Sequence, residues 1–129
     1  MTRKQARDEA FILIFEKQFS DASVEEILDL AKEVRDLEPD DYITEVFGGV
    51  VEKTDELNDV ISQKAIGWKL ERISKISLAI LKLAIYEILY IDSIPASVSI
   101  NEAVELCKKY ATQEDASFVN GILASVVKE

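Results

Sequence analysis

Apolar side chains are densest between residues 78 and 91, where only Lys82 and Glu87 carry charge. They surround most of a helix instead of forming one stripe, so this helix must be covered on several sides. It is too short and too charged to cross a bilayer, which needs about 20 predominantly apolar residues. The pattern therefore predicts the buried central helix of a bundle, with Ser74 as its N-cap and an end before Pro95.

Six further segments repeat apolar side chains at helical spacing, and no segment alternates as a strand does. Five of these predicted helices span about residues 3–19, 24–36, 40–53, 99–111 and 115–127, and the sixth lies between a Thr54 cap and a C′ glycine at Gly67. Ser99 and Glu102 have capping-box spacing, which predicts that Ser99 opens its helix. The chain is therefore predicted to be an all-α fold of seven helices in one domain, with an N-terminal part of about 1–53 and a C-terminal part of about 54–129.

Single residues within these segments carry more specific predictions. The pair Gly48-Gly49 lies inside a helix, where each glycine costs about 1 kcal/mol against alanine, so it predicts a close helix crossing. Gly121 on the last helix is expected to allow the approach of a neighbouring backbone. Trp68 at a helix junction is expected in the core, with a base-stacking platform as the alternative. Cys107 lies on an apolar stripe, which predicts a buried and unreactive thiol.

Composition narrows the possible chemistry. The 129 residues include no histidine, which excludes a histidine general base, a histidine-activated nucleophile and a His-ligated zinc. No metal-ligand spacing, nucleophile elbow or dinucleotide fingerprint is present. We therefore expect that the protein holds no metal and no cofactor and is not an enzyme. A single cysteine and a start without a signal-peptide pattern predict a cytoplasmic protein.

Charge is unevenly distributed along the chain. The formal net charge is −10, but Arg3, Lys4 and Arg7 all precede the first acidic residue, Asp8. Three cations at the positive end of a helix dipole are unfavourable, which favours an anion that they bind. The other interpretation is a solvated helix start that Asp8 neutralises in part through its spacing from Lys4. The residues alone leave the two interpretations even.

Five segments resemble the NusB family of bacterial transcription antitermination factors, in the order and spacing of that family and over essentially the whole chain. They are Arg3-Lys-Gln-Ala-Arg7, Trp68-Lys-Leu-Glu-Arg-Ile73, Ala79-Ile-Leu-Lys-Leu-Ala-Ile-Tyr-Glu87, Ile100-Asn-Glu-Ala-Val-Glu-Leu106 and Phe118-Val-Asn-Gly-Ile-Leu123. The resemblance implies two roughly perpendicular three-helix bundles without catalytic activity. It also implies binding of boxA-type single-stranded RNA with NusE, a small-subunit ribosomal protein, within the RNA polymerase antitermination complex that supports ribosomal RNA operons.

The resemblance also assigns residues. It favours phosphate contact by the basic start, and Lys82 stands where the family usually has an arginine. The RNA-binding residues that it implies are Arg3, Lys4, Arg7, Lys82 and Phe118, and the implied partner contacts are Glu71 and Ser77.

A different class of function competes with this interpretation. The net charge of −10 and a basic start of three cations are also compatible with a helical protein-interaction or self-associating module that does not bind RNA usefully, including a homodimer. The sequence leaves this alternative open.

Overall fold

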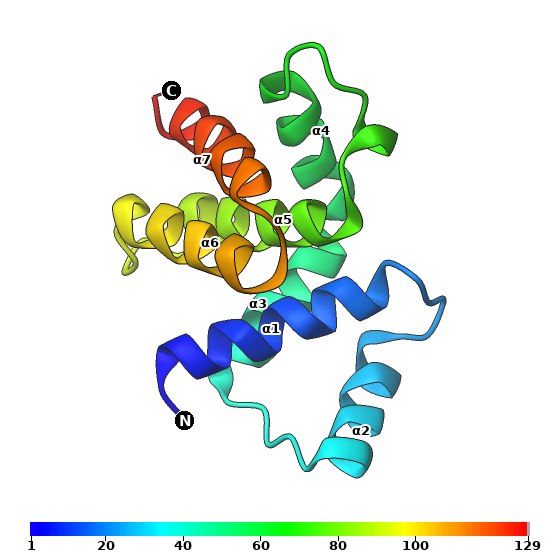
Figure 1. Cartoon of the computed structure of the whole chain (residues 1–129). Coiled ribbons are helices and arrows are strands. Elements are labelled where there is room, and N and C mark those ends of the chain that lie inside the picture. The colour runs from blue at the N-terminus through cyan, green and yellow to red at the C-terminus, as the bar shows by residue number, and fades with distance from the viewer. Residues whose placement is uncertain (129) are drawn as a thin grey trace.

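The computed structural model describes residues 1–128, which form seven α-helices, one short 3₁₀ helix and no strand (Figure 1). The predicted all-α fold is confirmed. The helices are α1 (Arg3–Lys17), α2 (Val24–Arg35), α3 (Asp41–Glu52), α4 (Thr54–Lys64), η1 (Leu70–Arg72), α5 (Lys75–Tyr90), α6 (Ala96–Tyr110) and α7 (Gln113–Val127).

Helix α5 is the centre of the fold. Every residue from Ser77 to Glu87 is buried, and the helix packs against α1, α3, α4, α6 and α7 (Figure 1). Its start matches the prediction, because the Ser74 hydroxyl accepts a hydrogen bond from the backbone N–H of Ser77 at 3.1 Å. The apolar pattern around the whole circumference of α5 therefore reflects neighbours on all sides.

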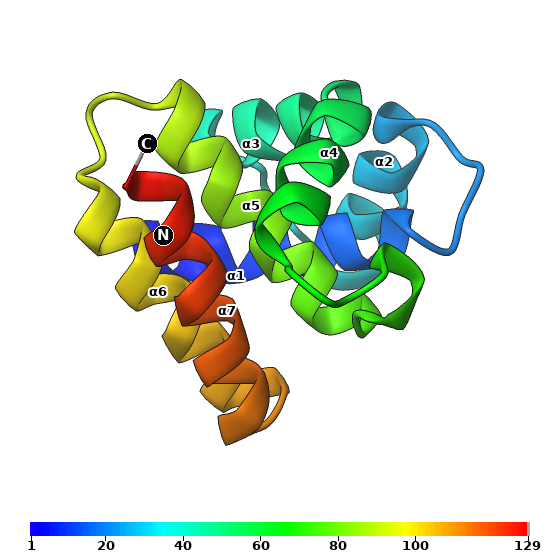
Figure 2. The same cartoon turned by 90° about the horizontal axis from the view of Figure 1, so that it is seen from above.

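The other helices form two groups around α5. Helix α1 runs antiparallel to α5, since Arg7 contacts Glu87 while Gln18 donates to the backbone carbonyl of Lys75 at 2.9 Å. Helices α2 and α3 pack with α1, and α6 and α7 lie side by side as an antiparallel pair (Figure 2). The division into 1–53 and 54–129 stays a prediction, because α5 contacts helices of both parts.

Three predicted helix starts are wrong. Helix α6 begins at Ala96 behind Pro95, which suits a helix start because proline needs no hydrogen-bond acceptor there. Ser99 is therefore inside the helix and only 1% exposed. Thr54 is the first residue of α4 and not its cap, and α7 begins earlier than predicted, behind a capping box of Thr112 and Asp115.

The glycines divide into tight and open positions. A Cβ on Gly49 would lie 2.3 Å from the Tyr86 ring, so the predicted close crossing is that of α3 with α5, whereas nothing lies within 4 Å of a Cβ on Gly48. Gly67 has a φ of +84°, as expected after a helix. Gly121 is also open, so the expected approach of a neighbouring backbone is wrong.

Cys107 is fully buried on the inner side of α6. Burial, followed by the charge of Asp115, raises the pKa of its thiol to about 12, which confirms an unreactive cysteine. Within residues 1–128, no helix has the length and apolarity needed to span a bilayer.

The two adjacent glycines of α3 give a matched test of the crossing. Gly49→Ala should lower the free energy of unfolding by about 1–3 kcal/mol, because the rigid, buried Tyr86 ring must move. Gly48→Ala should raise it by up to about 1 kcal/mol, because alanine is the better helix former and the site is open. Urea denaturation of both variants measures the difference, and equal effects would contradict the tight crossing.

Candidate nucleic-acid interface

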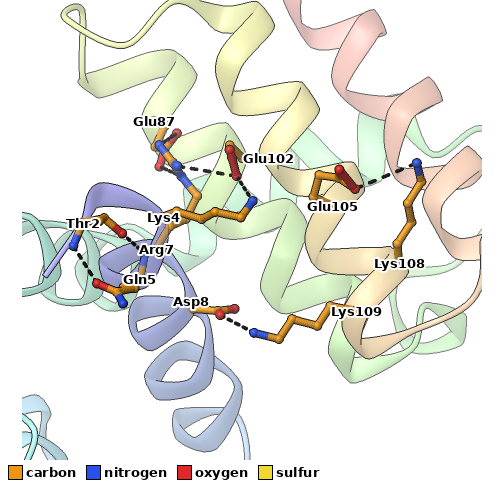
Figure 3. A network of polar contacts seen from close by, with 10 residues as sticks. All are labelled: Thr2, Lys4, Gln5, Arg7, Asp8, Glu87, Glu102, Glu105, Lys108 and Lys109. Carbon is orange, nitrogen blue, oxygen red and sulfur yellow. Dashed lines mark hydrogen bonds and ion pairs between the residues drawn. The ribbon is translucent and has the colours of Figure 1, made fainter.

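Arg7 does not lie on the surface. Its side chain is 4% exposed, and its Nε donates to Glu87 Oε2 at 2.8 Å while its Nη2 donates to Oε1 at 3.4 Å (Figure 3). Of the three cations predicted to contact phosphate, Arg7 is therefore the one that the structure pairs with a buried carboxylate. Spacing along the first helix could not reveal this, because the partner lies 80 residues away.

Glu87 collects donors from three helices besides its own. The Tyr42 hydroxyl from α3 donates to Oε2, and the Ser99 hydroxyl from α6 donates to Oε1 at 2.7 Å. Together with the two bonds from Arg7 on α1, both carboxylate oxygens are satisfied in a site that is 0% exposed. A buried charge is tolerated only under such conditions.

The ionisation of these groups follows from their surroundings. Burial lowers the pKa of Arg7, but the hydrogen bond and the charge of Glu87 outweigh it and raise that pKa above its ordinary value. Burial, and then the negative charge of Glu87, raises the pKa of Tyr42. Tyr42 therefore stays a neutral donor and Arg7 stays a cation, which keeps the pairing intact.

Two cations of the predicted cluster remain at the surface. The Arg3 guanidinium is exposed and lies 4.5 Å from the centroid of the Tyr42 ring. The Lys4 side chain is 70% exposed, and its Nζ lies 3.3 Å from Glu102 Oε2 on α6. The helix start itself is a capping box, in which Thr2 and Gln5 bond reciprocally (Figure 3). Arg3 and Lys4 thus keep the exposure that a phosphate contact needs.

Helix α6 adds two cations that local sequence patterns did not indicate. A groove of about 360 Å³ lies between α1 and α6, and Lys108 and Lys109 line it together with Lys4 (Figure 3). Lys109 Nζ lies 2.5 Å from Asp8 Oδ2, and both lysine side chains are more than half exposed. In the sequence, two adjacent lysines in the last turn of a helix are explained by their favourable interaction with the helix dipole. Only the packing of α6 on α1 shows that they lie next to the basic residues at the start of α1.

An aromatic hollow lies beside the first turns of α7. The rings of Trp68 and Phe118 have centroids 5.5 Å apart and meet edge to face. Trp68 is 55% exposed, so its expected place in the core is wrong, and Phe118 is half-buried. The hollow measures about 140 Å³, and Ser77, which is buried and has a hydroxyl without a hydrogen-bond partner among the described residues, lines it with Arg72.

The remaining predicted residues lie elsewhere. Lys82 is only 7% exposed and lines a separate hollow at the last turn of α1, together with Glu71. Glu71 and Ser77, the two expected partner contacts, therefore line different hollows. Arg3, Lys4 and the groove belong to one end of α1, whereas Lys82 lies near its other end.

The arrangement suits nucleic-acid binding more than acid–base chemistry. Exposed ion pairs are worth at most about 1 kcal/mol, so a phosphate can replace Glu102 or Asp8 as the partner of a lysine at little cost. An exposed ring beside a hollow can stack on an unpaired base. Within residues 1–128, no cluster of potential metal ligands is found.

Comparison with known proteins identifies the family of this chain and proteins of the same fold. The model of the NusB family matches residues 4–128. The transcription antitermination protein NusB of Ruminiclostridium cellulolyticum is 45% identical over 99% of this chain and 90% of its own length. The structure of T. maritima NusB is similar with a TM-score of 0.87 and 33% identity, covering 100% of this chain and 92% of that one.

A further solved structure contains the antitermination factors NusB and NusE in complex with dsRNA. One of its chains has a TM-score of 0.86 against this protein, at 24% identity, and covers 98% of this chain and 96% of its own. At that identity the likeness shows the fold alone.

The buried ion pair can be tested against an exposed one on the same helix. Arg7→Met should lower the free energy of unfolding by about 3–5 kcal/mol, because it leaves the Glu87 carboxylate buried without its cation. Lys4→Met should change it by no more than about 1 kcal/mol, because its pair with Glu102 is exposed. Urea denaturation measures both values. A cost for Arg7→Met no larger than that for Lys4→Met would show that the pair does not hold the fold.

Proposed function

The chain belongs to the NusB family, and on that premise we propose that it is a transcription antitermination factor that binds boxA-type RNA together with NusE. RNA lies along the groove between α1 and α6 in this proposal. The observation that carries it is the convergence of Lys4, Lys108 and Lys109 on one groove, with Arg3 exposed on the first turn of the same helix as Lys4.

Electrostatic attraction in this groove is local. The molecule carries a formal net charge of −10, so its overall field repels RNA, and the groove must act at short range. The lysine side chains there are exposed, and two of them are held by partly buried carboxylates, Glu102 and Asp8, which a phosphate can replace as their partner. Arg7 also lines the groove, but Glu87 holds its guanidinium, so in this proposal it fixes the helix that presents Lys4. Phosphate contacts of this kind position RNA without reading its sequence.

Recognition of bases is proposed for the aromatic hollow. Single-stranded RNA is read through unstacked bases that stack on aromatic side chains and bond through their edges. Phe118 provides a half-buried ring and Trp68 an exposed one, while the free Ser77 hydroxyl and Arg72 offer polar groups.

The partners complete the proposal. NusE is the protein partner, and Glu71 on η1 is an exposed candidate contact, whereas Ser77 is only 1% exposed. The complex acts on transcribing RNA polymerase in the cytoplasm, without a catalytic step, a cofactor or a membrane. The support is the family and a solved structure of the same fold that holds NusB, NusE and dsRNA. Self-association as a homodimer without RNA binding is the competing function.

The groove predicts a change in the salt dependence of binding. The triple variant Lys4→Gln, Lys108→Gln, Lys109→Gln should weaken RNA binding, because fewer phosphates of the single strand are neutralised. The slope of log K against log salt should become shallower by about 0.7 for each phosphate that the variant no longer neutralises. Fluorescence anisotropy with single-stranded boxA-type RNA, at several salt concentrations and in the presence of NusE, measures the slope.

Two controls make that titration decisive. Lys32→Gln removes an exposed lysine from α2, far from the groove, and should leave the slope unchanged. Duplex RNA in a parallel titration shows whether the groove prefers single strands. An unchanged slope for the triple variant would rule out the groove as the RNA site. A stable homodimer in light scattering that never binds RNA, with or without NusE, would favour the competing function.

Stacking gives a separate prediction. Trp68→Ala should weaken binding of single-stranded RNA by about 5- to 150-fold, because stacking on one aromatic side chain is worth about 1–3 kcal/mol. The salt slope should stay constant, since no phosphate contact is removed. Ile66→Ala, at an 89% exposed position two residues earlier, is the matched control. Equal affinities for both variants would exclude Trp68 as a stacking platform.

A further inference from the structure

A second cationic hollow lies at the opposite end of α1 from the groove. It measures about 360 Å³ and lies between the last turn of α1, the junction of α3 and α4, and the first half of α5. Among residues 1–128, three lysines line it, Lys17, Lys75 and Lys82, and Glu71 is the only acidic residue that does. No ion pair joins Glu71 to any of these lysines in the described part of the chain.

Lys82 is the unusual member of this group. It is only 7% exposed, and within residues 1–128 it has no hydrogen-bond or ion-pair partner. Burial, and then the positive charge of Lys75, lowers the pKa of its ammonium group. The same helix shows how the fold treats a buried charge elsewhere, because Glu87 receives four hydrogen bonds from three helices. Lys82 is therefore almost as deeply buried as Glu87 but lacks the partners that compensate the charge of Glu87.

The neighbours of Lys82 suit an oxyanion. Lys17 is half-buried and donates to the Ser20 carbonyl at 3.1 Å, which leaves its other hydrogens available. Lys75 is exposed at the first position of α5, near the positive end of the helix dipole. The Asn58 side-chain oxygen is buried without a partner among the described residues, and turning that amide over presents its NH₂ group to the hollow.

We propose that this hollow binds a phosphate group, with Lys82 at its floor and Lys17 and Lys75 at its rim. Three lysines and few acceptors match a small, doubly charged, tetrahedral ligand better than a carboxylate, which has one charge and two oxygens. The phosphate can belong to RNA or be free in solution as inorganic phosphate or a nucleotide. The site does not depend on the RNA groove, which lies at the other end of α1.

The test is a titration of the intact protein with inorganic phosphate, without RNA or NusE. Ionic strength is held constant with sodium chloride, and sodium acetate replaces phosphate in a parallel series. Phosphate should raise the thermal midpoint by a few degrees with saturation, and acetate should not. Calorimetry should show phosphate affinity at least about tenfold lower in Lys82→Met, since a charge-assisted hydrogen bond is removed.

Control variants separate binding from folding. Lys69→Met removes an exposed lysine just before η1 that does not line the hollow, and it should bind phosphate as the unaltered protein does. Lys82→Met removes an unpaired buried charge, so its midpoint without phosphate should equal or exceed that of the unaltered protein. If that variant does not fold, Lys75→Met, at an exposed position, should still bind phosphate several-fold more weakly.

A competition experiment between phosphate and RNA identifies the source of the phosphate. Displacement of bound phosphate by a single-stranded RNA oligonucleotide would identify an RNA phosphate as the ligand, and simultaneous binding of both would identify a free phosphate or nucleotide. Either result supports the site. Absence of a phosphate effect on the unaltered protein, an equal effect of acetate, or an unchanged affinity in the lysine variants would overturn it.

Discussion

The carboxylate of Glu87 is the charge around which the helices are arranged. An uncompensated buried carboxylate costs several kcal/mol, so only an arrangement that brings all of its donors together is stable. Arg7, Tyr42 and Ser99 supply those donors from α1, α3 and α6. Apolar packing alone would allow these helices to slide past one another by a fraction of a turn. Hydrogen bonds from three helices to one carboxylate do not allow this movement, because they fix the relative positions of the helices. The position of α1 over α6, and hence of the groove, follows from this constraint.

Two charged residues of α5 show opposite solutions to the burial of charge. Near the C-terminal end of the helix, Glu87 is fully paired inside the protein, and no ligand is needed. At the middle of the helix, Lys82 is almost as deeply buried but lies beside other cations. The first site contributes to the fold and the second is open to a ligand. A count of charged residues on the helix does not distinguish the two roles.

Local patterns were enough to predict much of the fold. The all-α class, the central helix with its Ser74 cap, the glycine crossing and the buried Cys107 depend on residues close in sequence, and all are found. The predictions that were wrong depended on contacts between residues distant in sequence, or on a choice between two possible helix starts. Pro95 could end one helix or begin the next, and the choice decided whether Ser99 was a cap or a core donor.

The candidate site was less predictable than the fold. Nothing within ten residues of Arg7 shows that its partner is a glutamate on another helix, and an arginine in a basic cluster resembles a surface residue. Trp68 was misplaced for the converse reason, because a large apolar side chain favours burial unless the loop that carries it remains outside the core. Lys108 and Lys109 become part of the groove only through the packing of α6 against α1.

Tyr42 joins the surface to the interior through a single ring. Its hydroxyl bonds to Glu87 in the core, while the exposed guanidinium of Arg3 rests 4.5 Å from the ring centroid. When a bound anion draws the Arg3 guanidinium away from the ring, the electric field at the Tyr42 phenol changes, while the hydrogen bond of the hydroxyl to Glu87 stays intact. The NMR chemical shifts of the Tyr42 ring are thus an intrinsic magnetic reporter of occupancy at the first turn of α1, and no attached label is needed.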